Sequence, residues 1–174
     1  MLIDDFRFEY ARWRQTAEKA IAQMPDEALN HVPSPEGNSV AMLARHVSGN
    51  LVSRFTDFLE TDGEKPWRDR DSEFEERPYT RAEVEERWET GWRVLDAQLA
   101  ALTESDISRT VRIRGQALTV QEALLRSMAH VAYHVGQIVL IARMLSQDRW
   151  RWITIPKGES TAYNSNPTME RRPS

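Results

Sequence analysis

Cysteine is absent from the sequence. Its absence excludes disulfide bonds, thiolate-ligated metal sites and a cysteine nucleophile. An excess of basic residues is also missing, because the 174-residue chain has a formal net charge of −4, and we therefore expect no nucleic-acid partner. Glycine is scarce, with seven residues, and the length fits a single globular domain across residues 1–174.

Long uninterrupted hydrophobic runs are missing as well. Charged residues interrupt every apolar segment before it reaches the roughly 20 residues that a membrane-spanning helix requires. The first residues, Met1 to Phe6, include two aspartates and lack the apolar stretch of a signal peptide. These features predict a soluble, cytoplasmic protein without a membrane partner.

Apolar residues recur at steps of three and four along four segments, which is the spacing of amphipathic helices. Two of these segments begin with a Thr-x-x-Glu capping box, at Thr80–Glu83 and at Thr119–Glu122. A short β-hairpin is predicted over Thr110–Thr119, around Gly115. The sequence thus predicts an all-α protein whose four helices cover about residues 2–23, 39–61, 81–102 and 120–146.

The connection between the second and third predicted helices, residues 62–80, constrains the topology. A helix of about 23 residues is about 35 Å long, whereas about 19 extended residues span about 60 Å. The connection can therefore recross a bundle, and we expect an up-down-down-up four-helix bundle. Region 60–89, with twelve acidic and six basic residues, is interpreted as a solvated loop and helix face. The tail, residues 147–164, contains Trp150 and Ile153 and is expected to pack on the bundle.

Three of the four histidines lie in predicted helices. His130 and His134 are one helical turn apart, so both imidazoles share one face of the last helix. His46 lies in the second helix on a polar stripe that includes Asn50 and Asp57, and such a stripe is costly to bury unless it serves ligands or water. The three imidazoles are either ligands of one divalent metal, Zn²⁺, Ni²⁺ or Fe²⁺, or core histidines hydrogen-bonded to their neighbours.

Other metal and nucleophile motifs are missing. Val131 stands where an HExxH zinc protease has glutamate, and no Glu-x-x-His of the ferritin-like type occurs. A Gly-x-Ser-x-Gly elbow and a glycine-rich phosphate loop are also absent. The fourth histidine, His31, lies in a turn-rich segment and is expected to be exposed.

One histidine on the second helix, followed far downstream by His-x₃-His on the last helix, resembles the DinB-like superfamily of metal-binding four-helix bundles. The resemblance covers about residues 1–146, and the superfamily includes bacillithiol- and mycothiol-dependent transferases and isomerases. It implies that His46, His130 and His134 bind one divalent metal. Three stretches resemble a less characterised branch: Arg45–Asn50, Asp62–Arg68 and Ile155–Gly158.

The open coordination positions of such a metal would convert a thiol ligand into a thiolate, which is the nucleophilic form. We therefore expect transfer of a low-molecular-weight thiol, acting as a cosubstrate, onto a small electrophile. The alternatives are hydrolysis by a metal-activated water and a non-enzymatic, metal-stabilised binding or stress-response module. Asn50, Gln137 and Trp92 are candidate substrate-binding residues, although tryptophan at helical spacing is more often core. The last helix is apolar on most sides and favours a homodimer.

Overall fold

The computed structural model describes residues 2–171, apart from the side chain of Gln147. This part of the chain is mostly helical, with five α-helices and one small antiparallel sheet. The helices are α1 (Leu2–Ile21), α2 (Val40–Phe55), α3 (Arg81–Ala101), α4 (Val120–Leu145) and α5 (Ser160–Asn164). The sheet consists of β1 (Thr110–Ile113) and β2 (Gln116–Thr119). The predictions of a mainly helical protein and of a hairpin before the last long helix are confirmed.

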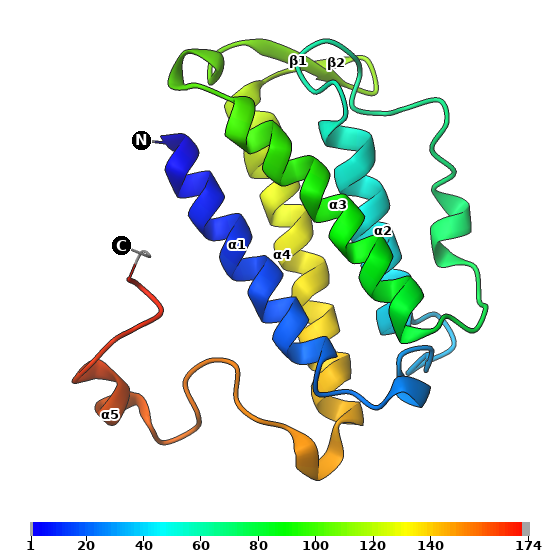
Figure 1. Ribbon diagram of the computed structural model, residues 1–174, viewed down its shortest axis with the longest axis vertical. Helices are drawn as coiled ribbons and strands as arrows, with labels where there is room; N and C mark the ends of the chain where they lie inside the picture. Colours follow the sequence, from blue (N-terminus) through cyan, green and yellow to red (C-terminus); the bar gives the residue numbers. More distant parts are fainter. Residues whose placement is uncertain (1, 172–174) are drawn as a thin grey trace.

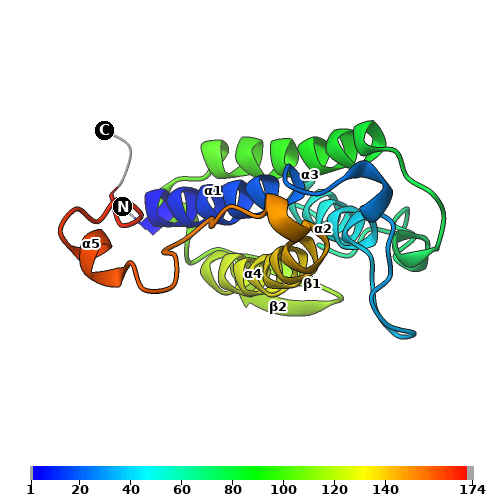
Figure 2. The same ribbon diagram turned by 90° about the horizontal axis from the view of Figure 1, so that it is seen from below.

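The four long helices lie side by side (Figure 1). α1 and α4 run away from the hairpin, whereas α2 and α3 run toward it. α2 packs mainly against α3, and α1 packs mainly against α4. Figure 2 shows α3 and α4 on opposite sides of α1 and α2. The long connection between α2 and α3 returns along the outside of the molecule and carries the short 3-10 helix η2 (Asp71–Phe74), which packs against α2.

Helix α2 ends at Phe55 rather than at Thr61, where the sequence pattern placed its end. Asp57 has a φ of 47°, in the left-handed region, and this conformation does not continue a helix. Gly63, the expected stop signal, instead ties the connection to the hairpin, because its N–H donates to the carbonyl oxygen of Arg112 at 2.8 Å. The polar sequence around residues 56–61 therefore forms turns and not a last helical turn.

Both predicted capping boxes form and fix where α3 and α4 begin. At α3, the Thr80 N–H donates to Glu83 Oε2 at 2.8 Å, and the Glu83 N–H donates to Thr80 Oγ1 at 3.2 Å. At α4, the corresponding distances between Thr119 and Glu122 are 2.7 and 3.1 Å. Each box satisfies two backbone groups that a helix start leaves without intrahelical partners.

The tail after α4 is only partly packed. Trp150 and Ile153 are half-buried and pack against the core, whereas Trp152 is exposed. α5 lies outside the group of long helices in both views (Figures 1 and 2) and has no buried residue. Packing of the whole stretch 147–164 on the helices was expected, but most of it is exposed because few of its apolar side chains reach the core.

Helix α4 is long and apolar enough to cross a membrane by length and composition alone. The expectation that charged residues interrupt every such run was therefore too strict. A mostly buried core helix passes the same test, but only 33% of this apolar window of α4 is buried, where the helix contacts α1 and α2. The absence of a membrane partner stays a prediction.

Helices α2 and α3 pack closely where Gly91 faces Ser48. A Cβ atom on Gly91 would lie 2.7 Å from Ser48 Cα and 3.0 Å from the Ser48 carbonyl oxygen. The Ser48 hydroxyl donates to the Arg87 carbonyl oxygen at 2.5 Å, which adds a polar link between the two helices. Position 91 therefore requires glycine because two backbones meet there. Since Ser48 follows His46 by two residues, this contact also fixes the position of His46.

We predict that Gly91→Ala lowers the free energy of unfolding by about 1–3 kcal/mol, because the added methyl overpacks the α2–α3 contact. Gly136→Ala is the matched control, since a Cβ there meets no atom within 4 Å. This control should gain about 0.5–1 kcal/mol from the better helix propensity of alanine. Urea denaturation of both variants measures the difference. Equal stability of Gly91→Ala and the wild-type protein would refute the required close approach.

Candidate metal centre

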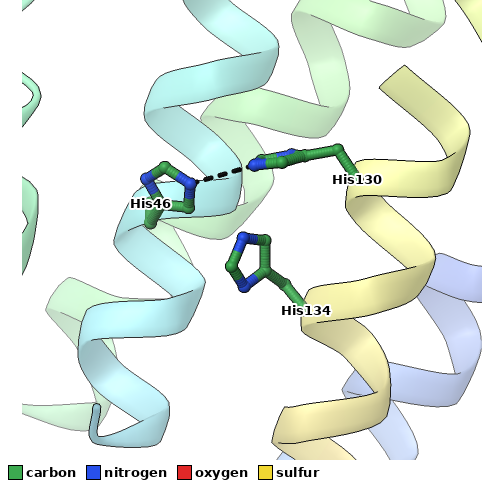
Figure 3. A group of neighbouring side chains, drawn as sticks. All are labelled: His46, His130 and His134. Atoms are coloured by element: carbon green, nitrogen blue, oxygen red, sulfur yellow. Dashed lines mark hydrogen bonds between the residues drawn. The ribbon is translucent and has the colours of Figure 1, made fainter. Parts of the chain in front are cut away.

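Three histidines from two helices converge at one place (Figure 3). His46 projects from α2, and His130 and His134 project from successive turns of α4, which runs in the opposite direction. One ring nitrogen of each lies within 4.8 Å of the others, so the three side chains are close enough to bind a metal ion. His46 and His134 are buried and His130 is half-buried. His31 is exposed, as predicted.

Oxygen acceptors face the Nδ1 atoms of two of these histidines. His46 Nδ1 lies 2.8 Å from Glu73 Oε2, and His134 Nδ1 lies 2.8 Å from Gln137 Oε1. Because both oxygens accept a hydrogen bond, each Nδ1 carries a proton, and in the neutral form of the ring each Nε2 then keeps its lone pair. This is the arrangement found behind metal-ligating histidines, in which an outer acceptor sets the tautomer and the orientation of the ring.

The contacts of the third imidazole, His130, indicate whether a metal fits the cluster. Its Nε2 lies 3.0 Å from His46 Nε2, and its Nδ1 is buried without a hydrogen-bond partner among the described residues. If His130 carries its proton on Nε2, its Nδ1 is left without a partner. If the proton is on Nδ1, the lone pairs of His130 Nε2 and His46 Nε2 face each other, and a cation between them would bind both. Two nitrogen ligands of a tetrahedral ion lie about 3.3 Å apart, close to the observed distance. The cluster therefore fits a divalent metal.

The surroundings keep the imidazoles of His130 and His134 neutral. Burial, followed by the nearby His134 and His46, lowers the pKa of His130 to about 3. Burial also lowers the pKa of His134, and the hydrogen bond with Gln137 offsets only part of this effect. A neutral imidazole is the form that coordinates metal, so near pH 7 the protein need not release a proton from either ring before binding.

Glu73 is the residue that organises the centre from outside. Its two carboxylate oxygens accept hydrogen bonds from Arg68 Nε and Nη2, both at 2.9 Å, while Oε2 also faces His46. Burial raises the pKa of Glu73, but the hydrogen bonds from His46 and Arg68 outweigh this effect and lower it overall. The carboxylate thus stays charged with Arg68 as its counter-ion. Gly49 makes room for it, because a Cβ there would lie 2.1 Å from Glu73 Oε1.

Sequence reasoning missed Glu73. It lies in region 60–89, which was interpreted as a solvated loop and helix face, yet Glu73 and Lys65 are both buried. That interpretation is wrong for these two residues, because ion pairs and hydrogen bonds compensate the burial of their charges. Arg68, which pairs with Glu73, and Gly49, which leaves space for it, both lie within the stretches that carry the resemblance.

The three candidate substrate-binding residues have different surroundings. Asn50 is buried and lines a cavity with His46 and His130. Gln137 Oε1 lies 2.8 Å from His134 Nδ1, so its side chain orients one of the three histidine rings. Trp92 is fully buried in the core, edge-on to Tyr10 and near Trp88, and the cavity beside the histidines is built without it.

The sequence pattern of a protein family of unknown function, DUF1572, matches residues 1–159. The chain belongs to the DUF1572 family. The match includes all three histidines, Glu73 and the four long helices, and it ends just before α5. No curated protein matches the sequence.

Two cavities adjoin the centre of this DUF1572 protein. One, of about 450 Å³, is bounded by α2, the long connection, the hairpin and α4, and it includes His46, His130 and Asn50. The other, of about 540 Å³, shares Arg68 with the first and includes Glu73, but it contains none of the three histidines. Of these two cavities, the smaller one is the one that the imidazoles of His46 and His130 line.

We predict that Glu73→Gln weakens Zn²⁺ binding about 10–100-fold, because the amide loses the charge that strengthens the His46 ligand and pairs with Arg68. Gly49→Ala should act in the same direction by displacing the carboxylate. Isothermal titration with Zn²⁺ measures both, and Glu76→Gln, at an exposed position three residues away, is the matched control. Unaltered affinity in Glu73→Gln would contradict an organising role for this carboxylate.

Proposed function

We propose that the protein binds one divalent metal, Zn²⁺, Ni²⁺ or Fe²⁺, through His46, His130 and His134. The observation that carries this proposal is the convergence of one ring nitrogen from each of the three histidines. In two of them, His46 and His134, the Nδ1 atom is hydrogen-bonded to Glu73 and to Gln137, respectively. Three protein ligands leave coordination positions for a substrate, which is typical of catalytic and not of structural zinc sites.

We further propose that the four long helices form an up-down-down-up four-helix bundle of the DinB-like superfamily. The directions of the helices and the long connection between α2 and α3 support this assignment (Figure 1). The positions of the histidines also support it, because one lies on the second helix and two on the last long helix, as in the resemblance described above.

The function that fits this site best is transfer of a low-molecular-weight thiol onto a small electrophile. The metal would supply one property, a lowered pKa of a coordinating thiol, so that the sulfur is ionised near neutral pH. The chain supplies the rest. Glu73 and Gln137 hold the ligand rings, and Asn50 lies in the cavity where it can hydrogen-bond a bound molecule. Because the chain contains no cysteine, the thiol enters as a cosubstrate.

Two other functions remain candidates. A water activated by the same metal would make the protein a hydrolase, and a metal that only stabilises the helices would make it a binding or stress-response module. The cavity beside the histidines favours an enzyme over the module, because a purely structural metal needs no access for small molecules.

We predict about one equivalent of divalent metal in the wild-type protein and a large loss in His130→Ala and His134→Ala. His31→Ala is the matched control, because this histidine is exposed and remote from the cluster. Removing metal with a chelator should lower the melting temperature, since a ligand at 100 times its dissociation constant contributes about 2.7 kcal/mol. Elemental analysis and thermal unfolding measure the two effects. Unchanged metal content in both variants would exclude the site.

Activity assays with the metal-loaded protein then separate the three functions. Conjugation of a thiol to a model electrophile is the expected result. Hydrolysis of an activated ester without conjugation indicates the hydrolase, and bound metal with neither activity indicates the binding module.

We also propose that the protein forms a homodimer through α4. Four large apolar side chains at spacings of eight, seven and four residues share one exposed face of this helix, each more than half exposed: Leu125, Tyr133, Leu140 and Met144. The tail does not cover them, so they form an exposed apolar face that a second copy of the chain can bury. We predict a dimer mass in sedimentation that Leu140→Glu converts to a monomer. A monomer mass for the wild-type protein would remove the proposal.

A further inference from the structure

The cavity beside the histidines has a strongly basic lining. It includes five arginines and, among the described residues that line it, no aspartate or glutamate: Arg54, Arg68, Arg70, Arg114 and Arg126. These arginines come from α2, the long connection, the hairpin turn and α4, which are far apart in the sequence. Placing five like charges around one cavity of about 450 Å³ is costly unless an anion joins them.

Nearby carboxylates neutralise only part of this charge. Glu64 Oε2 forms ion pairs with two of the arginines, because it lies 3.1 Å from Arg54 Nη2 and 2.9 Å from Arg114 Nε. Glu73 serves a third, Arg68, with both of its oxygens. Asp62 supplies a third carboxylate, which accepts hydrogen bonds from the N–H groups of Arg114 and Gly115 and is attracted by Arg54. Three carboxylates thus balance these three guanidinium groups, and the unbalanced positive charge lies on the other two arginines.

Arg70 and Arg126 add the remaining positive charge. Arg126 is exposed and has no ion pair among the described residues. The nearest partner of Arg70 is the carboxylate of Asp71, 3.8 Å away on a side chain that is 98% exposed, so solvent screens this pair. Both guanidinium groups are therefore available to a bound molecule. Guanidinium is the side-chain group whose geometry matches carboxylate and phosphate.

The spacing along the helices sets the length of that molecule. Asn50 and Arg54 follow His46 by one and two turns of α2, and Arg126 precedes His130 by about one turn of α4. Because α2 and α4 run in opposite directions, both sets lie toward the hairpin end (Figure 1). At 1.5 Å per residue the arginines lie about 6–12 Å from the imidazoles along the helix axes.

We propose that this cavity binds the oxyanion group, a carboxylate or a phosphate, of an acidic small molecule whose other end reaches the histidine cluster. The inference names the substrate class of the proposed metal site and rests on that function. A divalent metal held by three neutral imidazoles keeps its full charge, which adds to the attraction for an anion. Arg70 and Arg126 are the specificity residues, and Arg54, Arg68 and Arg114 shape the field around them.

The test measures anion binding and metal binding separately in the full-length protein. Succinate and inorganic phosphate are the anionic probes, and succinamide is the neutral control of the same size as succinate. Isothermal titration at constant ionic strength gives their affinities for the wild-type protein, for Arg70→Ala/Arg126→Ala and for Arg93→Ala. Arg93 is an exposed arginine of α3 outside both cavities, so its variant controls for the loss of charge alone. Elemental analysis gives the metal content of each protein.

We expect an anionic probe to bind the wild-type protein and succinamide to bind at least tenfold more weakly. The double variant should lose about tenfold or more in anion affinity, because two charged hydrogen-bond donors are removed. Its metal content should equal that of the wild-type protein and of Arg93→Ala. The preferred probe identifies the oxyanion as a carboxylate or a phosphate.

Equal anion affinity in the double variant and in Arg93→Ala, or binding of succinamide as tight as that of both succinate and phosphate, would overturn the proposal. Failure of the metal function gives a different pattern. A wild-type protein without metal that still binds an anion through Arg70 and Arg126 keeps the oxyanion subsite and removes the metal centre. A metal-loaded protein that binds no anion keeps the metal centre and removes the oxyanion subsite.

Discussion

The structure depends on one electrostatic constraint, the meeting of three imidazole nitrogens whose lone pairs face a common point. Hydrogen bonds to Glu73 and Gln137 fix two of the rings from behind, so the orientation of their Nε2 atoms is determined before any ligand arrives. Without a cation, a proton on His130 Nε2 can link it to His46 Nε2 at 3.0 Å, but His130 Nδ1 then stays buried without a hydrogen-bond partner among the described residues, which is costly. The architecture around it is best understood as support for this geometry: capping boxes set the start of α4, and the close contact of Gly91 with Ser48 sets the position of α2 beside α3.

The same constraint explains the long connection between α2 and α3. Parallel neighbouring helices require a return path as long as the molecule, and this path brings Glu73 against His46 together with its counter-ion, Arg68. The carboxylate lies behind the ligand and not among the ring nitrogens that converge. It can therefore polarise the His46 imidazole without taking a place among the converging nitrogens, and the Arg68 guanidinium compensates the burial of its charge.

How much of this was predictable depends on the range of the interaction. Helical periodicity and the capping boxes are local, and they predict the mainly helical fold, the hairpin and the starts of α3 and α4. The i, i+4 spacing of His130 and His134 is local too, and the polar stripe on α2 points to His46. Glu73 could not be found in this way, because an acidic residue in a charged loop has the composition of a solvated one until its contacts with Gly49 and Arg68 are known. The predicted end of α2 was wrong for a related reason. Gly63 does not end the helix but hydrogen-bonds to Arg112 on the hairpin, which is far away in the sequence.

The charges of the cavity also bear on which nucleophile suits the site. A free thiol has a pKa of about 8.5, so a modest lowering by a metal ionises it near neutral pH without a general base. Water starts from a far higher pKa, and even when a metal lowers this to about 7, hydrolases commonly add a carboxylate or histidine that moves the proton. Among the described residues that line the cavity, the imidazoles are committed to the cluster and the remaining charged groups are arginines, which do not accept protons. A positive cavity also stabilises an entering thiolate and an acidic substrate alike. These features support the proposed thiol over water as the attacking group, and in that proposal the arginines would hold the acidic substrate.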